Sequence, residues 1–252
     1  MSFTNKVVIV TGASSGIGAS TALLFGKEGA DVVIVGRNET RLNNVAEQIA
    51  KVGKKPLIVN ADVGKDEDAK QIILRTVGKY GKINVLVNNA GIIGPCPVDD
   101  ENVVKSFDSI ITTNLRSIVL LTGLAAPHLK KTKGNIVNVS SIAGKTTIMP
   151  GNGPYCASKA AVDQYSRNSA LELAVYGIRV NIVSPGPVRT NIAEAAGITI
   201  TPAAMEGAKE MTALKILTEP EEVADVIVFL ASDKAKSITG SDYIIDAGCL
   251  VK

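Results

Sequence analysis

Histidine and cysteine are scarce in this chain, and their scarcity excludes several kinds of site. The sequence contains a single histidine, His128, and three cysteines, Cys96, Cys156 and Cys249. One histidine cannot build a histidine-based metal cluster or a Ser-His nucleophile system. Three widely spaced cysteines form neither a disulfide framework nor a metal-binding spacing. We therefore expect no metal site and a reducing compartment.

Blocks of like charge and long apolar runs are also missing. The net charge of the 252 residues is only +3, and no run of basic residues exceeds the pairs at 54–55 and 130–131. This pattern argues against nucleic acid as a partner. No apolar run approaches the ~18 residues of a membrane span, and the amino-terminal residues lack the layout of a signal peptide. We expect a cytoplasmic protein that does not enter a membrane.

Short β-branched runs alternate with longer amphipathic segments along the whole chain. Such alternation predicts a parallel sheet covered by helices on both faces, because near-continuous apolar strands must be buried on each side. We predict a single-domain Rossmann fold over 1–252, α/β in class, with a doubly wound seven-stranded sheet. The segment at about 191–214 interrupts the rhythm and is predicted to be a mobile helical lid. The predicted strands are 7–10, 32–35, 57–59, 85–87, 136–139, 180–183 and 243–245.

A glycine-rich turn, TGASSGIG at 11–18, follows the first predicted strand and precedes an amphipathic helix. Glycines allow backbone to approach a ligand closely, and the free N–H groups and dipole at a helix start favour a pyrophosphate. The motif therefore predicts a dinucleotide site. The alternative is a glycine-rich turn that binds nothing.

The end of the second predicted strand bears on the choice between NAD and NADP. A dinucleotide fold that holds the adenosine ribose hydroxyls places a carboxylate there. This chain instead has Gly36, Arg37 and Asn38. The Arg37 guanidinium can pair with a 2'-phosphate, to which Ser14 could add a hydroxyl contact, so we predict NADP. The alternative is that Arg37 is a solvated loop arginine.

A second group of polar residues follows the fifth predicted strand. Ser141 ends that strand, and Tyr155 and Lys159 open the next helix four residues apart, which places both side chains on one helical face. A nearby cation stabilises phenolate, so Tyr155 is a candidate proton donor. Asn114 lies inside an apolar helical stretch, where asparagine is a poor helix former, and is expected to need a buried partner. A surface Tyr–Lys pair and a solvent-facing asparagine are the alternatives.

Together these motifs resemble the short-chain dehydrogenase/reductase family, through TGASSGIG, NNAG at 88–91, Asn114, Ser141, the Tyr155-x-x-x-Lys159 pair and Pro185-Gly186. The resemblance implies that Tyr155 exchanges a proton with the substrate oxygen and that Ser141 hydrogen-bonds this oxygen. It implies that Lys159 holds the nicotinamide ribose and lowers the pKa of Tyr155, and that Asn114 positions Lys159 and a water chain. The residues predicted to contact the cofactor are Gly12, Ser14, Ser15, Gly16, Ile17, Gly18, Arg37, Asn38, Asp62, Val63, Asn89, Ala90, Gly91, Tyr155, Lys159, Pro185, Gly186, Val188 and Thr190.

The predicted function is NADP(H)-dependent hydride transfer with an apolar ketone, aldehyde or secondary alcohol. Ile93, Ser141, Met149, Tyr155 and Ile192 are predicted to bind this small-molecule substrate. The wider apolar pocket is predicted from Ile92, Ile93, Cys96, Met149, Ile192, Ile198, Met205 and Met211.

Three other functions stay open: a 3-oxoacyl-carrier reductase, a dinucleotide-binding regulator without turnover, and an epimerase or dehydratase. Relatives that act on acyl-carrier-linked substrates typically carry arginines near the ends of the two helices that form their subunit interface. This chain has Pro127-His128 and Val175-Tyr176 at those places, which weakens the acyl-carrier function. The resemblance also implies a homotetramer, or a homodimer, built through the helices that carry Asn114 and Tyr155.

Overall fold

One seven-stranded parallel sheet organises the chain in the computed structural model, which describes residues 2–197, 199 and 201–252. The strand order is β3-β2-β1-β4-β5-β6-β7, so the predicted doubly wound fold is confirmed. Each predicted strand is present and is at most two residues longer at either end. The strands are β1 Val7–Thr11, β2 Asp31–Gly36, β3 Leu57–Asn60, β4 Val85–Asn88, β5 Asn135–Val139, β6 Arg179–Pro185 and β7 Asp242–Ile245.

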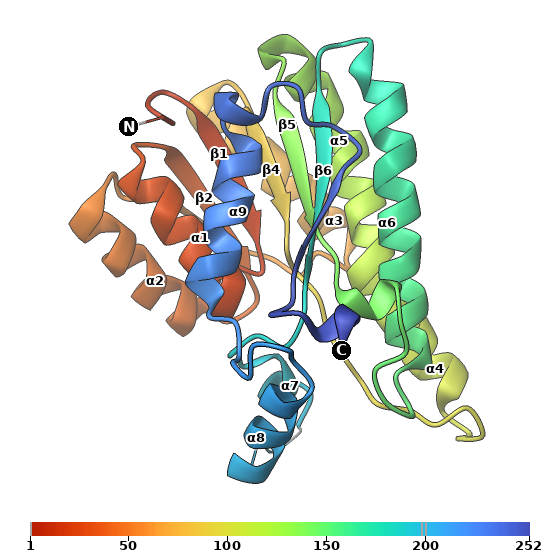
Figure 1. Cartoon of the computed structure of the whole chain (residues 1–252). Helices are drawn as coiled ribbons and strands as arrows, with labels where there is room; N and C mark the ends of the chain where they lie inside the picture. The colour runs from red at the N-terminus through yellow and green to blue at the C-terminus, as the bar shows by residue number, and fades with distance from the viewer. Residues whose placement is uncertain (1, 198, 200) are drawn as a thin grey trace.

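Helices cover both faces of this sheet (Figure 1). The α-helices are α1 Gly16–Lys27, α2 Glu39–Val52, α3 Asp66–Tyr80, α4 Val103–Ile111, α5 Ser117–Thr132, α6 Gly153–Ala174, α7 Ile192–Ala195, α8 Pro202–Glu210 and α9 Pro220–Ala231. A single π-helical turn, η1 Thr112–Arg116, joins α4 to α5, and 3₁₀ turns occur at η2 Ile142–Gly144, η3 Asp233–Ala235 and η4 Cys249–Val251.

Two hydrophobic cores lie on opposite faces of the sheet because successive strand residues point to opposite sides. In β1, Val8 and Val10 pack with the face covered by α1, α2 and α9, including Phe25. Val7 and Ile9 pack with the other face, which α3, α5 and α6 cover. Every β1 residue is buried, which explains its unbroken apolar sequence.

The strand order reverses at β1, which pairs with β2 on one side and with β4 on the other. In open α/β sheets a crevice forms outside the carboxyl ends of the strands at such a reversal, and ligands bind there. The first and fourth strand-to-helix connections therefore border the crevice.

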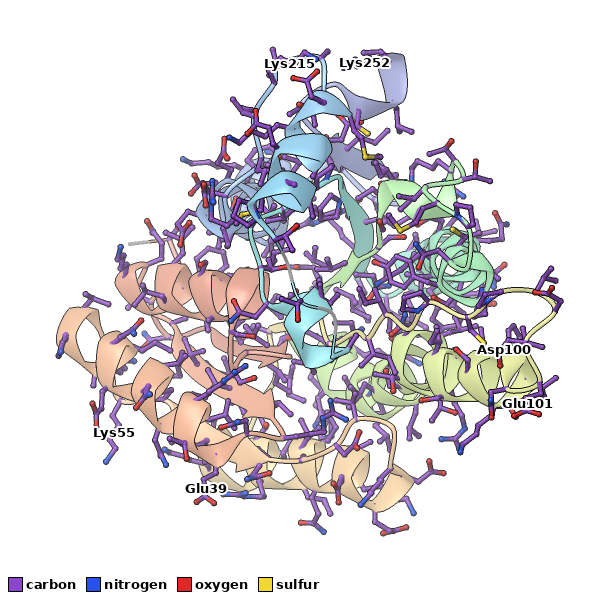
Figure 2. All side chains as sticks on the ribbon, turned by 90° about the horizontal axis from the view of Figure 1, so that it is seen from below. Glu39, Lys55, Asp100, Glu101, Lys215 and Lys252 are labelled. Carbon is purple, nitrogen blue, oxygen red and sulfur yellow. The ribbon has the colours of Figure 1, made fainter. Side chains whose placement is uncertain are left out.

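The segment after β6 stands beyond the carboxyl ends of the strands, where α7 and α8 project from the sheet (Figure 1). Thr201 caps α8 by accepting a hydrogen bond from the Ala204 backbone N–H at 3.2 Å. Seen from below, Lys215 and Lys252 lie close to each other beyond the end of α8 (Figure 2). Lys215 pairs with the Glu210 carboxylate and Lys252 donates to the Glu210 carbonyl, so the carboxyl-terminal residues hold the end of this segment.

The helical run Val103–Thr132 differs from the expectation that no apolar stretch is long enough for a membrane span. By length and composition this run of 30 residues could cross a membrane. Its 18-residue apolar stretch has a mean hydropathy of 1.4, and 39% of that stretch is buried in the protein. The sequence pattern missed it because scattered charges interrupt the apolar residues. One side of the run packs on the sheet, where Ile110, Leu121 and Leu129 are buried.

Candidate active site

The glycine-rich turn after β1 leaves hydrogen-bond donors free at the start of α1. Ser15 is the N-cap residue of this helix, yet its side chain makes no capping hydrogen bond. Its hydroxyl and the first N–H groups of α1 are therefore available to an anion. Gly12 has a φ of +65°, and a Cβ there would lie 2.8 Å from Asn89 Nδ2 and 2.9 Å from Ala90 Cα. Only glycine lets this turn pass so close to the loop after β4.

Gly18 departs from the prediction because it does not line the cavity. A Cβ at this position would lie 2.3 Å from the Gly12 carbonyl oxygen and 2.5 Å from Asn89 Nδ2. Gly18 is fully covered by these groups, so it allows close packing of α1 beneath the turn. The structure gives this glycine a packing role, and its contact with the cofactor stays a prediction.

The loop after β4 is tied to the end of β1. Thr11 Oγ1 accepts hydrogen bonds from the backbone N–H groups of Asn89 and Ala90, both at 3.0 Å. Asn89 Nδ2 donates to the Thr11 carbonyl at 2.9 Å. These bonds hold the predicted pair Asn89 and Ala90 against the glycine turn, where both residues and Gly91 line the cavity.

Two arginines line the cavity near the end of β2, Arg37 directly after the strand and Arg41 in the first turn of α2. Arg37 is 63% exposed, and its Nη1 lies 3.8 Å from Asp62 Oδ2. Asn38 caps α2 by accepting the Arg41 backbone N–H at 2.9 Å. Arg37, Asn38, Asp62 and Arg41 all line the same cavity. Arg41 was not selected from the sequence. It could have been found from its place in the first turn of the helix after β2, four residues beyond Arg37.

Asn114 has the buried partners that its helical setting required. It is fully buried in η1, and its Oδ1 accepts the Ile92 backbone N–H at 2.8 Å. Its Nδ2 donates to the Ile92 carbonyl at 2.9 Å and to Ser158 Oγ at 3.1 Å. The π-helical turn aims the amide at the loop after β4 instead of at solvent. Asn114 lies behind the cavity wall and does not line it.

Tyr155 and Lys159 lie one turn apart near the start of α6, as predicted. Lys159 Nζ is 5.7 Å from the centroid of the Tyr155 ring and donates a hydrogen bond to the Val139 carbonyl at 2.9 Å. A Cβ on Gly91 would lie 3.6 Å from Lys159 Nζ and 3.4 Å from Asn114 Oδ1. The loop after β4 therefore brings the two side chains to the same place.

Ser141 directly precedes η2 and closes this group. Its Oγ accepts the Ala143 backbone N–H at 3.1 Å and donates to the Pro185 carbonyl at 3.5 Å. Ser141, Tyr155 and Lys159 all line the cavity, and all three belong to the single connection that runs from β5 through η2 and α6 to β6.

The electrostatics of the pair differ from the sequence-based expectation. Burial raises the pKa of Tyr155 to about 12, and a hydrogen bond with Ser141 opposes this rise. Burial lowers the pKa of Lys159 to about 8, opposed by the charge of Asp163. The pKa of Tyr155 therefore lies above its ordinary value because desolvation of the phenol is the largest influence on it, and the lowering effect that the family resemblance assigns to Lys159 stays a prediction.

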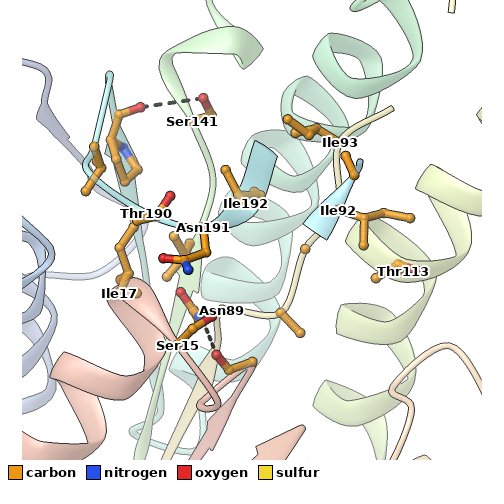
Figure 3. Close-up of a pocket in the computed structure, with 18 of the residues that line it drawn as sticks. Ser15, Ile17, Asn89, Ile92, Ile93, Thr113, Ser141, Thr190, Asn191 and Ile192 are labelled. Carbon is orange, nitrogen blue, oxygen red and sulfur yellow. Dashed lines mark hydrogen bonds between the residues drawn. The ribbon is translucent and has the colours of Figure 1, made fainter. Parts of the chain in front are cut away.

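The cavity has a volume of about 790 Å³ and runs from the glycine turn to α7 and α8 (Figure 3). Such a volume is within the range of cofactor and ligand sites. Except for Gly18 and Asn114, every residue predicted for the site lines it, including Ser14, Gly16, Ile17, Val63 and the segment Pro185, Gly186, Val188 and Thr190. The predicted substrate residues Ile93, Met149 and Ile192 also line it, as do Ile92 and Met211.

Two residues predicted for the apolar pocket lie elsewhere. Cys96 is buried where its backbone N–H bonds to the Gly151 carbonyl at 2.8 Å. Met205, which lies on α8, faces Arg189, and its sulfur is 3.9 Å from Arg189 Nη1. Ile198 lies outside the described residues. The structure adds apolar lining that sequence reasoning did not select: Ile142, Ile148, Ala196 and Ala208.

The glycine cradle fits a dinucleotide, and the wall opposite it carries the Ser–Tyr–Lys group. The chain matches the family model described as "Enoyl-(Acyl carrier protein) reductase" over residues 12–249. A short-chain dehydrogenase/reductase of Caenorhabditis elegans, solved with cofactor, superposes with a TM-score of 0.93 at 38% identity, covering 100% of this chain and 97% of the other. The chain belongs to the short-chain dehydrogenase/reductase family.

Two curated relatives from Thermotoga maritima are similar over nearly their whole length. An "Uncharacterized oxidoreductase" is 39% identical, with 98% of each chain covered. A 3-oxoacyl-acyl-carrier-protein reductase is 37% identical, with 100% of each chain covered. Family membership makes this chain an oxidoreductase that binds a nicotinamide dinucleotide. Among the residues that the structure describes, no group of three or more His, Cys, Asp or Glu side chains could hold a metal ion.

Proposed function

We propose that this chain transfers a hydride between NADP(H) and an apolar ketone, aldehyde or secondary alcohol. One observation carries the proposal: Ser141, Tyr155 and Lys159 open into the same cavity as the glycine turn that can hold a pyrophosphate. When bound, the cofactor supplies the hydride chemistry, and the protein binds, orients and exchanges the proton.

In this proposal Tyr155 exchanges a proton with the substrate oxygen. Its high pKa keeps the phenol protonated, as a proton donor for reduction must be. Ser141 donates a hydrogen bond to the same oxygen. Lys159 provides the buried ammonium beside the phenol, and Asn114 positions the loop after β4 through its two bonds to Ile92.

Arginines at the adenosine end of the cavity favour NADP over NAD. Arg37 and Arg41 line that end, and Asp62 is the acidic lining residue among the described ones. Because Arg37 is within 3.8 Å of Asp62, this carboxylate is partly neutralised by the arginine. A 2'-phosphate would meet two guanidinium groups here, and charge-assisted bonds to phosphate are among the stronger hydrogen bonds in proteins.

The other end of the cavity favours an apolar substrate. The charged side chains among the lining residues are Arg37, Arg41, Asp62 and Lys159. None of them lies on α7, α8 or the segment around Met149. Arg189 just before the lid is paired with Glu219, and Lys209 on α8 within the lid is paired with Glu206. An apolar ketone or alcohol fits this end of the cavity better than a charged substrate does.

A 3-oxoacyl-carrier reductase is the second candidate. The family-model description and one Thermotoga relative favour it. Against it, the cations near the lid are engaged in ion pairs, so an acidic carrier phosphate would have to compete for them. The two candidates differ in substrate, and a thioester substrate separates them.

The test measures oxidation of NADPH in the presence of a panel of apolar ketones, aldehydes and a 3-oxoacyl thioester, with NADH as the cofactor control. We expect turnover with NADPH and an apolar ketone, and loss of turnover in Tyr155→Phe with NADPH binding retained. Tyr165→Phe, on the same helix but away from the cavity lining, is the matched control and should keep its activity.

Activity in Tyr155→Phe would refute the proton-exchange role. Turnover confined to the thioester would establish the second candidate, and NADPH binding without any turnover would favour a regulator.

The exposed apolar side chains of α4, α5 and α6 support assembly into a homotetramer or homodimer. Val104 on α4, Val119 on α5 and Leu171 on α6 are exposed, Leu171 by 77%. A surface of this kind is typical of a subunit interface, and it accounts for the apolar run Val103–Thr132 without a membrane. Light scattering should report a multimer, and Leu171→Glu should reduce the measured mass. A monomeric wild-type protein would refute the assembly.

The remaining expectations follow from the same features. We propose that the chain folds as a single domain, that the segment 191–214 acts as a substrate lid, and that the protein resides in the cytoplasm. Three free cysteines support the reducing compartment.

A further inference from the structure

A partly buried ion cluster lies directly behind the active-site wall, with 21% of the Lys145 side chain exposed, and none of its members was selected from the sequence. Lys145, the residue after η2, places its Nζ 2.8 Å from Asp163 Oδ2 on α6 and 2.6 Å from Asp242 Oδ2 on β7. The same Nζ donates to Ser184 Oγ on β6 at 2.9 Å, and Ser184 Oγ donates to Asp242 Oδ1 at 2.7 Å. The cluster therefore joins the turn that carries Ser141 to α6, β6 and β7.

The turn from Ser141 to Lys145 lies flat against α6. A Cβ on Gly144 would be 2.9 Å from the Ala160 nitrogen, 2.9 Å from the Lys159 carbonyl carbon and 3.0 Å from Asp163 Oδ2. No larger residue fits between the turn and the helix at this point. Ser140 Oγ also donates to the Lys159 carbonyl at 3.2 Å. Lys145 stands at the end of this turn and forms an ion pair with Asp163 on α6. The ion pair therefore fixes the position of Ser141 relative to the helix that carries Tyr155 and Lys159.

Asp163 follows Lys159 by four residues, so the two side chains are neighbours on one face of α6. Both are buried, with 4% of each residue exposed. Asp163 Oδ1 is also buried and has no hydrogen-bond partner among the described residues. A carboxylate with one unbonded oxygen in a low-dielectric interior acts strongly on a neighbouring charge.

The other groups that face Lys159 are uncharged. From β5 the Val139 carbonyl accepts its hydrogen bond, the loop after β4 presents Gly91, and η1 presents the Asn114 amide. On α6 the titratable neighbours are Tyr155 and Asp163. Among the described residues, Asp163 is thus the negatively charged neighbour of the buried ammonium.

The carboxylates of the cluster are paired with cations. Lys145 pairs with it, and Arg167 lies 4.0 Å from Asp242 at the outer side of the cluster. Two cations therefore accompany two carboxylates. Without Lys145, two acids would share a buried site with no cation of comparable burial, and such an arrangement is strongly destabilising.

We infer that Asp163 is a positioning residue that keeps Lys159 in its charged form, and that Lys145 couples it to the turn bearing Ser141. The inference rests on the proposed function for the importance of that charge, but the charge itself can be measured without turnover. Burial alone lowers the pKa of Lys159, and Asp163 opposes that fall. Removing the carboxylate should therefore lower the pKa of Lys159 further.

The experiment follows the Lys159 side chain by NMR in protein labelled with ¹³C-lysine, with its signal identified by its absence in Lys159→Met. In the full-length wild-type protein we expect a titration midpoint near the pKa of about 8. In Asp163→Asn, which can still accept a hydrogen bond from Lys145, the midpoint should move down by about one pH unit or more. Asp163→Glu restores the charge and should return it toward the wild-type value. Asp163→Ser serves in place of Asp163→Asn if the latter does not fold.

Asp242→Asn is the matched control, because it removes the same charge from the same cluster on a different element. Its Lys159 midpoint should coincide with that of the wild type. Coincident midpoints in Asp163→Asn and the wild type, or equal shifts in the Asp163 and Asp242 variants, would overturn the inference. If the midpoint shifts in Asp163→Asn while the wild-type protein shows no turnover with any substrate, the inference is supported and the proposed function is contradicted. The two failures are therefore distinguishable.

Discussion

Replacement of Lys159 by methionine should change how the stability of the protein depends on pH. Burial lowers the pKa of Lys159 from 10.5 to about 8. The unfolded chain therefore binds more protons than the native protein between these values, and the wild-type free energy of unfolding rises with pH in this window. Below about pH 8 the buried ammonium imposes its full cost, and above 10.5 it imposes none. Lys159→Met lacks this contribution at every pH.

The size of the effect follows from the same values. At 1.36 kcal/mol per pH unit, the difference between 10.5 and about 8 corresponds to roughly 3 kcal/mol at pH 7, of which about 1 kcal/mol remains at pH 10. The variant also leaves the Val139 carbonyl without its hydrogen bond from Lys159, which costs about 1–3 kcal/mol at every pH. The absolute difference between the two proteins is therefore small at pH 7, but the variant should lose roughly 2 kcal/mol relative to the wild type between pH 7 and pH 10.

Urea unfolding at a fixed protein concentration measures this difference at each pH. Far-ultraviolet circular dichroism is the suitable probe, because the chain contains no tryptophan. Lys51→Met on α2 is the matched control, because it removes an exposed lysine by the same substitution. A Lys159→Met curve that stays parallel to the wild-type curve from pH 7 to pH 10 would refute the reasoning from burial.

Three further changes test other parts of the structure. Arg37→Ala should raise the Kd of NADPH by about 10- to 100-fold while leaving that of NADH nearly unchanged, as measured by titration calorimetry, because a charge-assisted hydrogen bond contributes about 1.5–3 kcal/mol; equal losses for both cofactors would contradict the 2'-phosphate contact. Gly18→Ala should lower the free energy of unfolding by roughly 1–3 kcal/mol, because its Cβ would lie 2.3 Å from the Gly12 carbonyl oxygen, and an unchanged urea midpoint would count against this packing. Glu222→Ala should cost about 1 kcal/mol in the same assay, because Glu222 accepts the Glu219 backbone N–H at 2.6 Å in the capping box of α9; no loss would mean that the cap does not stabilise the helix.

Much of the site could be predicted from sequence because its parts lie at the ends of strands. The β-branched runs fixed seven strands to within two residues, and parallel strands bring their carboxyl ends to one edge. The glycine turn, Arg37, Ser141 and Tyr155 each follow such a strand or open the next helix. Their meeting in one cavity therefore followed from position along the chain.

Burial and long-range pairing were decided only by the tertiary structure. The sequence places Lys159 beside Tyr155, but it does not show that burial of the phenol raises its pKa to about 12. It places Asn114 in an apolar helix, but only the π-helical turn aims this amide behind the cavity wall. Cys96 looked like pocket lining because it is apolar and near the loop, yet it is covered by the backbone at Gly151.

The ion cluster shows the same limit most clearly. Lys145, Asp163 and Asp242 are distant in sequence and belong to no local motif, and only the packing of the turn, the helix and the edge strand brings both carboxylates within 3 Å of Lys145 Nζ. Local chemistry along the chain determined the strands, the glycine turn and the reactive side chains. The protonation of those side chains depends on which charges and how much solvent surround them, and only the folded chain sets both.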